Sequence, residues 1–263
     1  MSAIDIHTHA FPDEIAERTI AALQAEGDWK AVGNGTISGL VESMDAADID
    51  VSCVCTIATK PDQVKGILNW CKKIRSDRIE PLPSVHPKTP GAARWIRRFA
   101  QHEFAGIKLH PMYQDFVADD PAMDPIFSAV RECGLFVALH CGNDIAFPGD
   151  ARAAPLRVRR LIDRHPDLKL VCTHLGGWQA WDQAERYVLG TSAYVETSFS
   201  VPLLGLERAG QLIRRHDPRR ILFGTDWPWA SQKEDLALLD RLNLKAAERK
   251  AILWANAARL LGY

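Results

Sequence analysis

The sequence predicts an α/β protein that folds as one (β/α)8 TIM barrel with extra C-terminal helices. Short runs rich in Val, Ile and Leu alternate with longer segments of helical spacing, which is the pattern of a parallel sheet whose strands are joined by helices. The chain has 263 residues, a length that such barrels often occupy as a single unit. No shift in composition marks a linker, so we expect one domain over residues 1–263. A distorted barrel is consistent with the same pattern.

Eight candidate strands can be counted, at 3–9, 51–57, 79–86, 106–110, 135–140, 168–174, 193–198 and 221–226. Candidate helices lie at 13–26, 37–47, 61–74, 91–102, 121–133, 151–165, 178–189, 206–216, 233–242 and 245–261. The alternative is an open, doubly wound sheet, which usually has a glycine-rich first turn. The segment after the first strand, residues 9–12, has no glycine, and this favours the barrel. We expect the glycine-containing loop at 27–35 to lie over the mouth of the barrel.

The composition is that of a soluble globular protein, with 47% hydrophobic and 25% charged residues. The formal net charge of −1 gives no electrostatic reason to expect a nucleic-acid partner. No apolar run approaches the length that crosses a bilayer, and no basic segment followed by an apolar one opens the chain. We therefore expect a cytoplasmic protein with a small-molecule substrate and no membrane partner; the sequence leaves a homo-oligomer open.

Histidines gather at the ends of the predicted strands. Six of the nine histidines occupy these ends: His7, His9, His86, His110, His140 and His174. The eighth strand ends in an aspartate, Asp226. In a (β/α)8 barrel the carboxyl ends of the strands form the face that carries the active site. Any single one of these histidines is open to a reading as a core residue, and Asp226 to one as a turn residue. Their joint placement favours a shared site.

The first strand supplies the opening pair of this site. His7 and His9 are two residues apart, so on a β-strand both imidazoles project from one face. Two neutral imidazoles side by side are typical metal ligands, although an exposed strand or a purification tag would give the same motif. An ionised Asp226 inside a barrel mouth must be paired or metal-bound, and a divalent ion would satisfy it.

These residues resemble the amidohydrolase superfamily, whose metal-site pattern is similar to the ordered set of His7-x-His9, His140, His174 and Asp226. Four flanking segments are similar to the subgroup called amidohydrolase family 2; they lie at 106–111, 173–177, 224–228 and 256–261. The resemblance runs from Asp5 to Leu261. That subgroup contains metal-dependent TIM-barrel hydrolases, lactonases and decarboxylases.

The resemblance implies one divalent metal, with zinc as the expected ion, held by His7, His9, His140 and Asp226. A water molecule activated by the metal would be the nucleophile. Asp226 would also accept and deliver a proton, and His174 would polarise the substrate or share the proton transfer. His174 and Asp226 are therefore the expected catalytic residues.

Lys108 leaves the number of metals open. In binuclear members of the superfamily a carboxylated lysine on the fourth strand bridges two ions, and Lys108 lies on the predicted fourth strand. In this subgroup one metal is the more usual expectation, and Lys108 would then bind a substrate carboxylate. His110, His86 and Trp227 are further candidates for substrate contacts.

Three functions remain at this point. The first is a metal-dependent hydrolase that acts on a small cyclic or carboxylate-bearing substrate, such as a lactone or an amide. The second is a nonoxidative metal-dependent decarboxylase, a lyase, of the same subgroup. The third is a catalytically silent barrel that serves as a binding protein, which would require an incomplete site, and all five residues of the pattern are present.

Overall fold

Eight parallel strands alternate with helices in the computed structural model, which describes residues 2–263. The strands are β1 (Ile4–Thr8), β2 (Val51–Cys55), β3 (Ile79–Leu82), β4 (Gly106–Leu109), β5 (Phe136–Leu139), β6 (Lys169–Cys172), β7 (Tyr194–Glu196) and β8 (Ile221–Leu222). Every predicted strand is present, each within the predicted range. The fold is a TIM barrel, as the sequence predicts.

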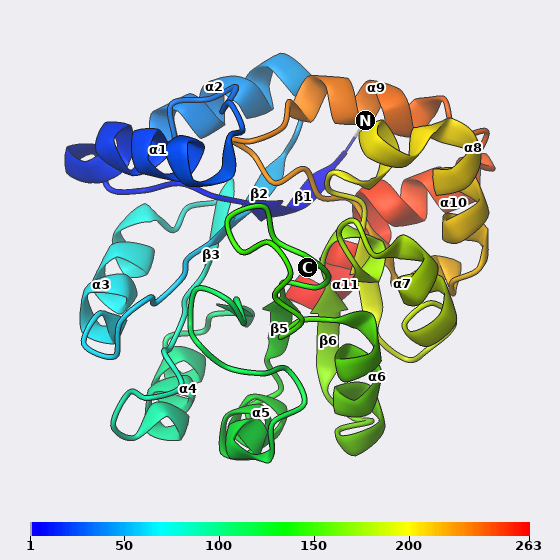
Figure 1. The fold of residues 1–263 in the computed structure, drawn as a ribbon. Helices are drawn as coiled ribbons and strands as arrows, with labels where there is room; N and C mark the ends of the chain where they lie inside the picture. The colour runs from blue at the N-terminus through cyan, green and yellow to red at the C-terminus, as the bar shows by residue number, and fades with distance from the viewer. Residues whose placement is uncertain (1) are drawn as a thin grey trace.

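The helices surround the strands (Figure 1). They are α1 (Asp13–Gly27), α2 (Ile37–Ala47), α3 (Val64–Ile74), α4 (Ala92–Gln101), α5 (Asp124–Glu132), α6 (Pro155–Arg164), α7 (Trp181–Tyr187), α8 (Ser200–Arg214), α9 (Gln232–Asp240), α10 (Ala246–Lys250) and α11 (Asn256–Leu261). Short 3-10 segments precede α5, α7 and β8, and a π-helical turn, η4 (Ala251–Ala255), joins α10 to α11. The helix α8 begins earlier than its predicted start at residue 206, because the chain is already helical at Ser200 and breaks at Gly205.

Backbone pairing divides the barrel wall into two sheets, with strand orders β1-β2-β3 and β4-β5-β6-β7-β8. Pro83 follows β3 at the first seam and has no N–H to donate to β4. Its carbonyl accepts from the Lys108 amide at 3.0 Å, and the Ser84 hydroxyl donates to the Lys108 carbonyl at 2.8 Å. At the second seam Ile6 N–H donates to the Phe223 carbonyl at 3.0 Å, which joins β8 to β1. The barrel is therefore closed but irregular.

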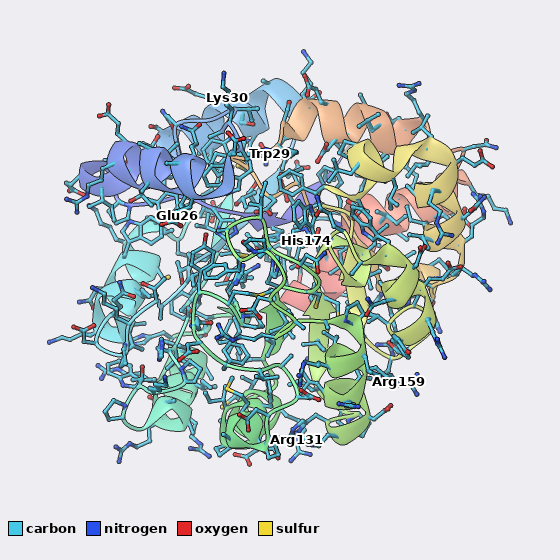
Figure 2. The ribbon with its side chains drawn as sticks, in the orientation of Figure 1. Glu26, Trp29, Lys30, Arg131, Arg159 and His174 are labelled. Carbon is cyan, nitrogen blue, oxygen red and sulfur yellow. The ribbon has the colours of Figure 1, made fainter. Side chains whose placement is uncertain are left out.

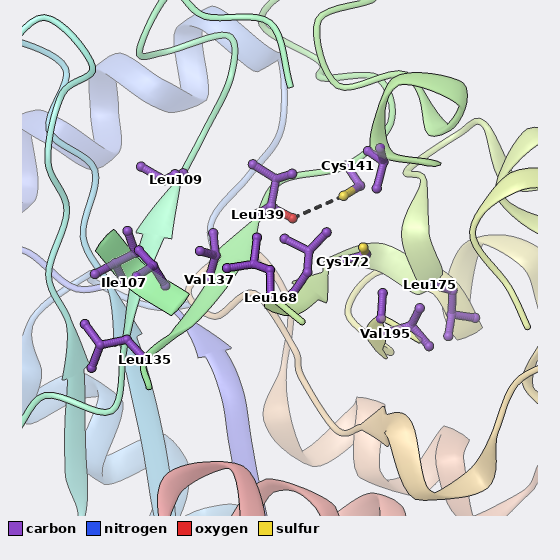
Figure 3. Close-up of a cluster of buried hydrophobic side chains, with 14 of the residues drawn as sticks. Ile107, Leu109, Leu135, Val137, Leu139, Cys141, Leu168, Cys172, Leu175 and Val195 are labelled. Atoms are coloured by element: carbon purple, nitrogen blue, oxygen red, sulfur yellow. Dashed lines mark hydrogen bonds between the residues drawn. The ribbon is translucent and has the colours of Figure 1, made fainter. Parts of the chain in front are cut away.

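Alternating residues of the strands face the barrel interior and the helices. Figure 2 shows the side chains on this frame, with His174 near the centre and Arg131 and Arg159 at the rim. Figure 3 shows the outer layer, in which Val137 and Leu139 of β5 pack with Ile107 and Val195 of other strands. The inward residues Phe136 and Ala138 belong to a second apolar cluster, so His140, two residues further on, also faces inward.

The C-terminal helix fills the barrel interior from the end opposite the predicted site. Ala257, Ala258 and Leu260 of α11 pack with the inward residues Ile4 and Leu222. Figure 1 accordingly shows α11 and the C-terminus at the centre of the ring of helices. The helix is fixed by the buried Asn256, as its amide donates to the carbonyls of Pro218 and Ile221, both at 2.8 Å.

A register shift in β1 sets the direction of its histidines. The pairing with β2 gains one residue between Asp5 and Thr8, the signature of a β-bulge. Asp5 therefore faces the outer layer, where its carboxylate accepts from Thr225 at 2.6 Å and from Gln232 at 2.8 Å. His7 faces the interior although it lies two residues from Asp5, and Thr8 turns to the Cys53 carbonyl.

Within residues 2–263, the helices are all too short or too polar to cross a membrane.

Replacing Asn256 by alanine is expected to lower the free energy of unfolding by about 1–3 kcal/mol, because two buried carbonyls lose their donor. The midpoint of urea denaturation measures this change. Arg259→Ala is the control, because Arg259 is an exposed neighbour in the same helix that bonds Asn256 Oδ1 at 2.9 Å. An Asn256→Ala variant no less stable than the Arg259→Ala variant would contradict this role.

Candidate metal centre

The carboxyl ends of the strands surround a cavity of about 560 Å³. Side chains from five strand ends line it: His7 and His9 at the end of β1, Lys108 and His110 at β4, His140 after β5, His174 after β6 and Asp226 after β8. The structure thus brings together every residue of the predicted metal and catalytic set. All of them are buried except His9, which is partly buried.

Three ligand atoms form a compact triangle at the centre of this set. His7 Nε2 lies 3.2 Å from His9 Nε2, and Asp226 Oδ1 lies 3.5 Å from the first nitrogen and 3.2 Å from the second. Ligands placed about 2.1 Å from a tetrahedral ion are about 3.4 Å apart. The triangle therefore has the dimensions of three corners of such a coordination sphere.

The outer nitrogens of the two rings are occupied by acceptors. His7 Nδ1 lies 3.1 Å from Glu196 Oε1, and His9 Nδ1 lies 2.9 Å from the Cys55 carbonyl. A carboxylate and a carbonyl accept hydrogen bonds, so each Nδ1 carries the proton and each Nε2 presents a lone pair to the centre. Two lone pairs facing one another at 3.2 Å repel unless a cation lies between them.

Asp226 adds a negative charge to the same point. Its backbone has a positive φ of 67°, and its amide donates to the His7 carbonyl at 2.7 Å, so the strand end is fixed beside β1. Asp226 Oδ1 is buried and has no hydrogen-bond partner. Burial would raise the pKa of this carboxyl, but the interactions with His7 and His9 outweigh burial and hold the pKa well below its usual range. An ionised carboxylate oxygen without a donor fits a metal ligand.

His140 and His174 lie on the other side of the triangle. His174 Nε2 is 3.3 Å from His140 Nδ1 and 4.0 Å from Asp226 Oδ2. The remaining nitrogens are held at 2.8 Å, His174 Nδ1 by the Ser198 hydroxyl and His140 Nε2 by the Asn143 carbonyl. Ligand atoms of His7, His174 and Asp226 all lie within 4.8 Å of one another, so His174 is also within reach of an ion.

Burial keeps these imidazoles neutral. Desolvation lowers the pKa of His174 to about 3 and that of His110 to about 4, and it also lowers the pKa of His140. Near pH 7 these rings are therefore uncharged, which is the form that binds a metal.

Glu196, at the end of β7, was not among the residues that the sequence singled out. It is fully buried, and Oε1 accepts from His7 Nδ1 and from the His174 amide, the latter at 2.8 Å. Its carboxylate lies against Gly224, where a β-carbon would collide with it. An acidic residue at the end of an apolar strand, followed two residues later by Ser198, was the available signal.

Lys108 lies inside the cavity wall with its ammonium 2.9 Å from His7 Nε2. Its side chain is 1% exposed. Across residues 2–263, no carboxylate lies within ion-pair distance of it. The Lys108 side chain is thus buried beside the triangle, with His7 as its hydrogen-bond partner and without a paired carboxylate among the described residues.

A second group of possible ligands surrounds His140. His110 stacks on His140 with ring centres 4.1 Å apart, and Asp144 Oδ2 lies 3.2 Å from His110 Nε2 and 3.9 Å from His140 Nε2. Asp144 lies in the loop after β5, where sequence periodicity gives no signal. His110 lines the cavity, which is the position that a substrate contact requires.

Two predicted substrate contacts lie elsewhere. His86 does not line the cavity; its Nδ1 accepts from the Lys88 amide, because the chain turns at the end of β3. Trp227 is 2% exposed and packs beneath Gly33, whereas Trp229 lines the cavity. The expectation for Trp227 is therefore wrong: Asp226 has a left-handed backbone and a turn follows it, and Trp229 is the tryptophan that reaches the cavity.

The loop at 27–35 was expected over the mouth of the barrel, and Gly27 and Trp29 of this loop line the cavity. Trp29 lines the cavity, donates to the Trp229 carbonyl at 3.1 Å and meets Phe199 edge to face. Figure 2 shows Trp29 on the segment that follows α1. These aromatic rings form part of the cavity wall beside the candidate metal ligands.

Solved structures with the same fold are numerous. A TIM-barrel protein from Bordetella bronchiseptica is 18% identical with a TM-score of 0.76, covering 100% of this chain and 99% of its own. A probable 2-pyrone-4,6-dicarboxylic acid hydrolase from Acinetobacter baumannii, with citric acid bound, is 15% identical with a TM-score of 0.70, and 100% of each chain is covered. A 5-carboxyvanillate decarboxylase from Novosphingobium aromaticivorans, with bound manganese, is 18% identical with a TM-score of 0.74, covering 99% of this chain and 97% of its own. These likenesses establish the fold.

A search of curated proteins gives no significant match. A family model described as Amidohydrolase, that of amidohydrolase family 2, matches residues 4–263. The match spans every strand end that lines the cavity. The chain belongs to amidohydrolase family 2.

Proposed function

We propose that this protein is a metal-dependent hydrolase that uses a metal-activated water on a small cyclic or carboxylate-bearing substrate, such as a lactone or an amide. The triangle of His7 Nε2, His9 Nε2 and Asp226 Oδ1, with sides of 3.2–3.5 Å, carries this proposal. His140 would be the fourth ligand. Bound there, a divalent ion supplies a Lewis acid that polarises a carbonyl and acidifies water.

The donor set suits zinc, since imidazole nitrogens and one carboxylate are common zinc ligands. The same set also accepts manganese, the ion bound by the similar decarboxylase from Novosphingobium aromaticivorans. We propose zinc as the first ion to test.

Proton transfer would involve Asp226 and His174. Asp226 Oδ2 is 4.0 Å from His174 Nε2, so a group placed between them contacts both. The carboxylate accepts the proton of the attacking water and returns it to the leaving group, because it is ionised at the start of the reaction. The neutral His174 ring is held by Ser198 and orients the substrate carbonyl.

Lys108 would hold the acidic end of the substrate. Its buried ammonium has no carboxylate partner among residues 2–263 and points into the cavity beside His7. A substrate carboxylate would replace the missing counter-charge. A carboxylated Lys108 that bridges a second ion is the competing assignment, and the cluster of His110, His140 and Asp144 lies nearby.

A nonoxidative decarboxylase is the second candidate. The position of Lys108 favours it. A substrate carboxylate next to this lysine and Asp226 would lie in a cavity walled by Trp29, Phe199 and Trp229. An apolar wall disfavours a charged carboxylate relative to neutral CO₂.

Product analysis separates the two reactions. We expect the zinc-loaded protein, screened against lactones, amides and hydroxybenzoates, to release one acid group per turnover from a lactone or amide without forming CO₂. Acid release is followed with a pH indicator and CO₂ with a coupled carboxylase assay. Release of CO₂ from an aromatic acid with no hydrolysis in the screen would replace the first candidate by the second.

Single substitutions separate ligands from proton-transfer residues. His9→Ala is expected to lose bound metal and activity, because it removes one corner of the triangle. His174→Ala is expected to keep the metal and lower turnover by about 100-fold or more. Elemental analysis of the purified variants, with His102→Ala as a control outside the cavity, measures both. Loss of metal from the His174→Ala variant would make His174 a ligand.

Glu196→Gln is expected to weaken metal affinity by about 10–100-fold, because the carboxylate fixes the ring of His7 and strengthens its lone pair. Competition with a chelator measures this affinity, and excess zinc should restore activity. Glu80→Gln is the matched control, because Glu80 on β3 pairs with Arg75 outside the cavity. Equal affinities in the two variants would show that Glu196 does not act on the metal centre.

A further inference from the structure

The cavity continues from the metal centre to the space between two helices. Figure 1 shows these helices, α1 and α3, next to one another at the edge of the barrel. The inner face of α1 contributes Ile15, Thr19 and Leu23, each four residues from the next. A face of α3 contributes Gly66, Ile67 and Trp70, and Gln63 lies at the N-cap of this helix. We call the space between these seven residues the outer arm.

The outer arm is long compared with a small substrate. Ile15 and Leu23 are eight residues apart on α1, which corresponds to about 12 Å along the helix axis. The whole cavity has a volume of about 560 Å³, within the range of roughly 300–1,000 Å³ that holds drug-sized ligands. A monocyclic lactone at the metal centre would leave the outer arm unfilled.

The surface of the outer arm is mostly apolar. Ile15, Leu23, Ile67 and Trp70 line it and are only partly buried, so their hydrocarbon surface is still accessible. Among the described residues that line the cavity next to the outer arm, Asp62 is charged, and it is exposed. Apolar surface of this kind gains free energy when a hydrocarbon group covers it.

Gly66 keeps the outer arm open. It lies within α3, where glycine is less favourable than alanine, yet a β-carbon added there meets no atom within 4 Å. Gly66 is exposed and lines the cavity, so a side chain at this position would extend into open space beside the cavity wall. Gly66 is therefore the position at which the arm can be filled without disturbing the helix.

We propose that the outer arm binds an extended hydrocarbon chain of the substrate, whose carbonyl or carboxylate end lies at the metal centre. The cavity is continuous from Asp226 and Lys108 to Trp70, so one molecule contacts both ends. The placement of the polar end of the substrate at the metal centre rests on the proposed function. The placement of its hydrocarbon chain rests on the apolar walls of α1 and α3. The outer arm then determines specificity for chain length.

The proposal is tested by the binding of straight-chain carboxylates from butyrate to decanoate. Isothermal titration of the zinc-loaded protein measures their dissociation constants, and no turnover is required. We expect affinity to rise about fourfold with each methylene that enters the outer arm. Affinity independent of chain length would overturn the proposal.

Variants of α3 locate the effect. Gly66→Leu should lower the ratio of decanoate to butyrate affinity by at least tenfold, because the new side chain occupies the outer arm. Gly66→Ala should keep most of that ratio. Lys65→Leu adds the same side chain to the neighbouring position, which is exposed and outside the cavity, and should leave the ratio unchanged. Equal ratios for the Gly66→Leu and Lys65→Leu variants would place the chain elsewhere.

The two proposals fail separately. Chain-length-dependent binding that Gly66→Leu abolishes, in a protein that hydrolyses no lactone or amide, would support the outer arm and contradict the hydrolase. Hydrolysis of short and long substrates with equal KM would support the hydrolase and overturn the outer arm.

Discussion

Two imidazole lone pairs and one ionised carboxylate oxygen are held within 3.5 Å of each other, and the rest of the site follows from this constraint. Like partial charges face one another there in a buried space, so positive charge stabilises the arrangement, and the Lys108 ammonium, 2.9 Å from His7 Nε2, supplies one such contact at its edge. The protein maintains it by fixing each outer ring nitrogen: Glu196 holds His7, and the Cys55 carbonyl holds His9. The repulsion between the two nitrogen lone pairs and the carboxylate oxygen favours binding of a positive ion at the centre.

The barrel seam produces this convergence. Asp226 belongs to the last strand end and His7 to the first, and they meet only because β8 closes against β1, with Asp226 N–H donating to the His7 carbonyl. The bulge in β1 then rotates His7 inward while Asp5 remains in the outer layer. Closure depends in turn on Asn256, whose amide fixes α11 below β8. His174 and Asp226 both have a left-handed backbone, with φ of 57° and 67°, and this conformation sets the direction of their side chains at the strand ends.

Much of this organisation could be predicted from sequence, and the failures have common causes. All eight strands follow from alternating apolar runs, and the histidine ends follow from the rule that active sites of such barrels lie at the carboxyl ends of strands. Side-chain direction after the last paired residue could not be predicted, because it depends on turns. His86 therefore lies outside the cavity, and Trp229 rather than Trp227 lines it. Glu196 and Asp144 were missed because a single acidic residue has no periodicity, and its function arises only from tertiary contacts.

The apolar cover and the polar centre depend on one another. Burial of the strand ends lowers the pKa of His174 to about 3, and Trp29, Phe199 and Trp229 line the same cavity. A better hydrated site would allow protons to compete for the same lone pairs. Burial thus disfavours protonation of the ligands, and the aromatic rings adjoin the apolar walls of α1 and α3. The polar centre and the apolar walls therefore face one continuous cavity, so a ligand that reaches both would combine polar contacts at the strand ends with hydrocarbon contacts beyond them.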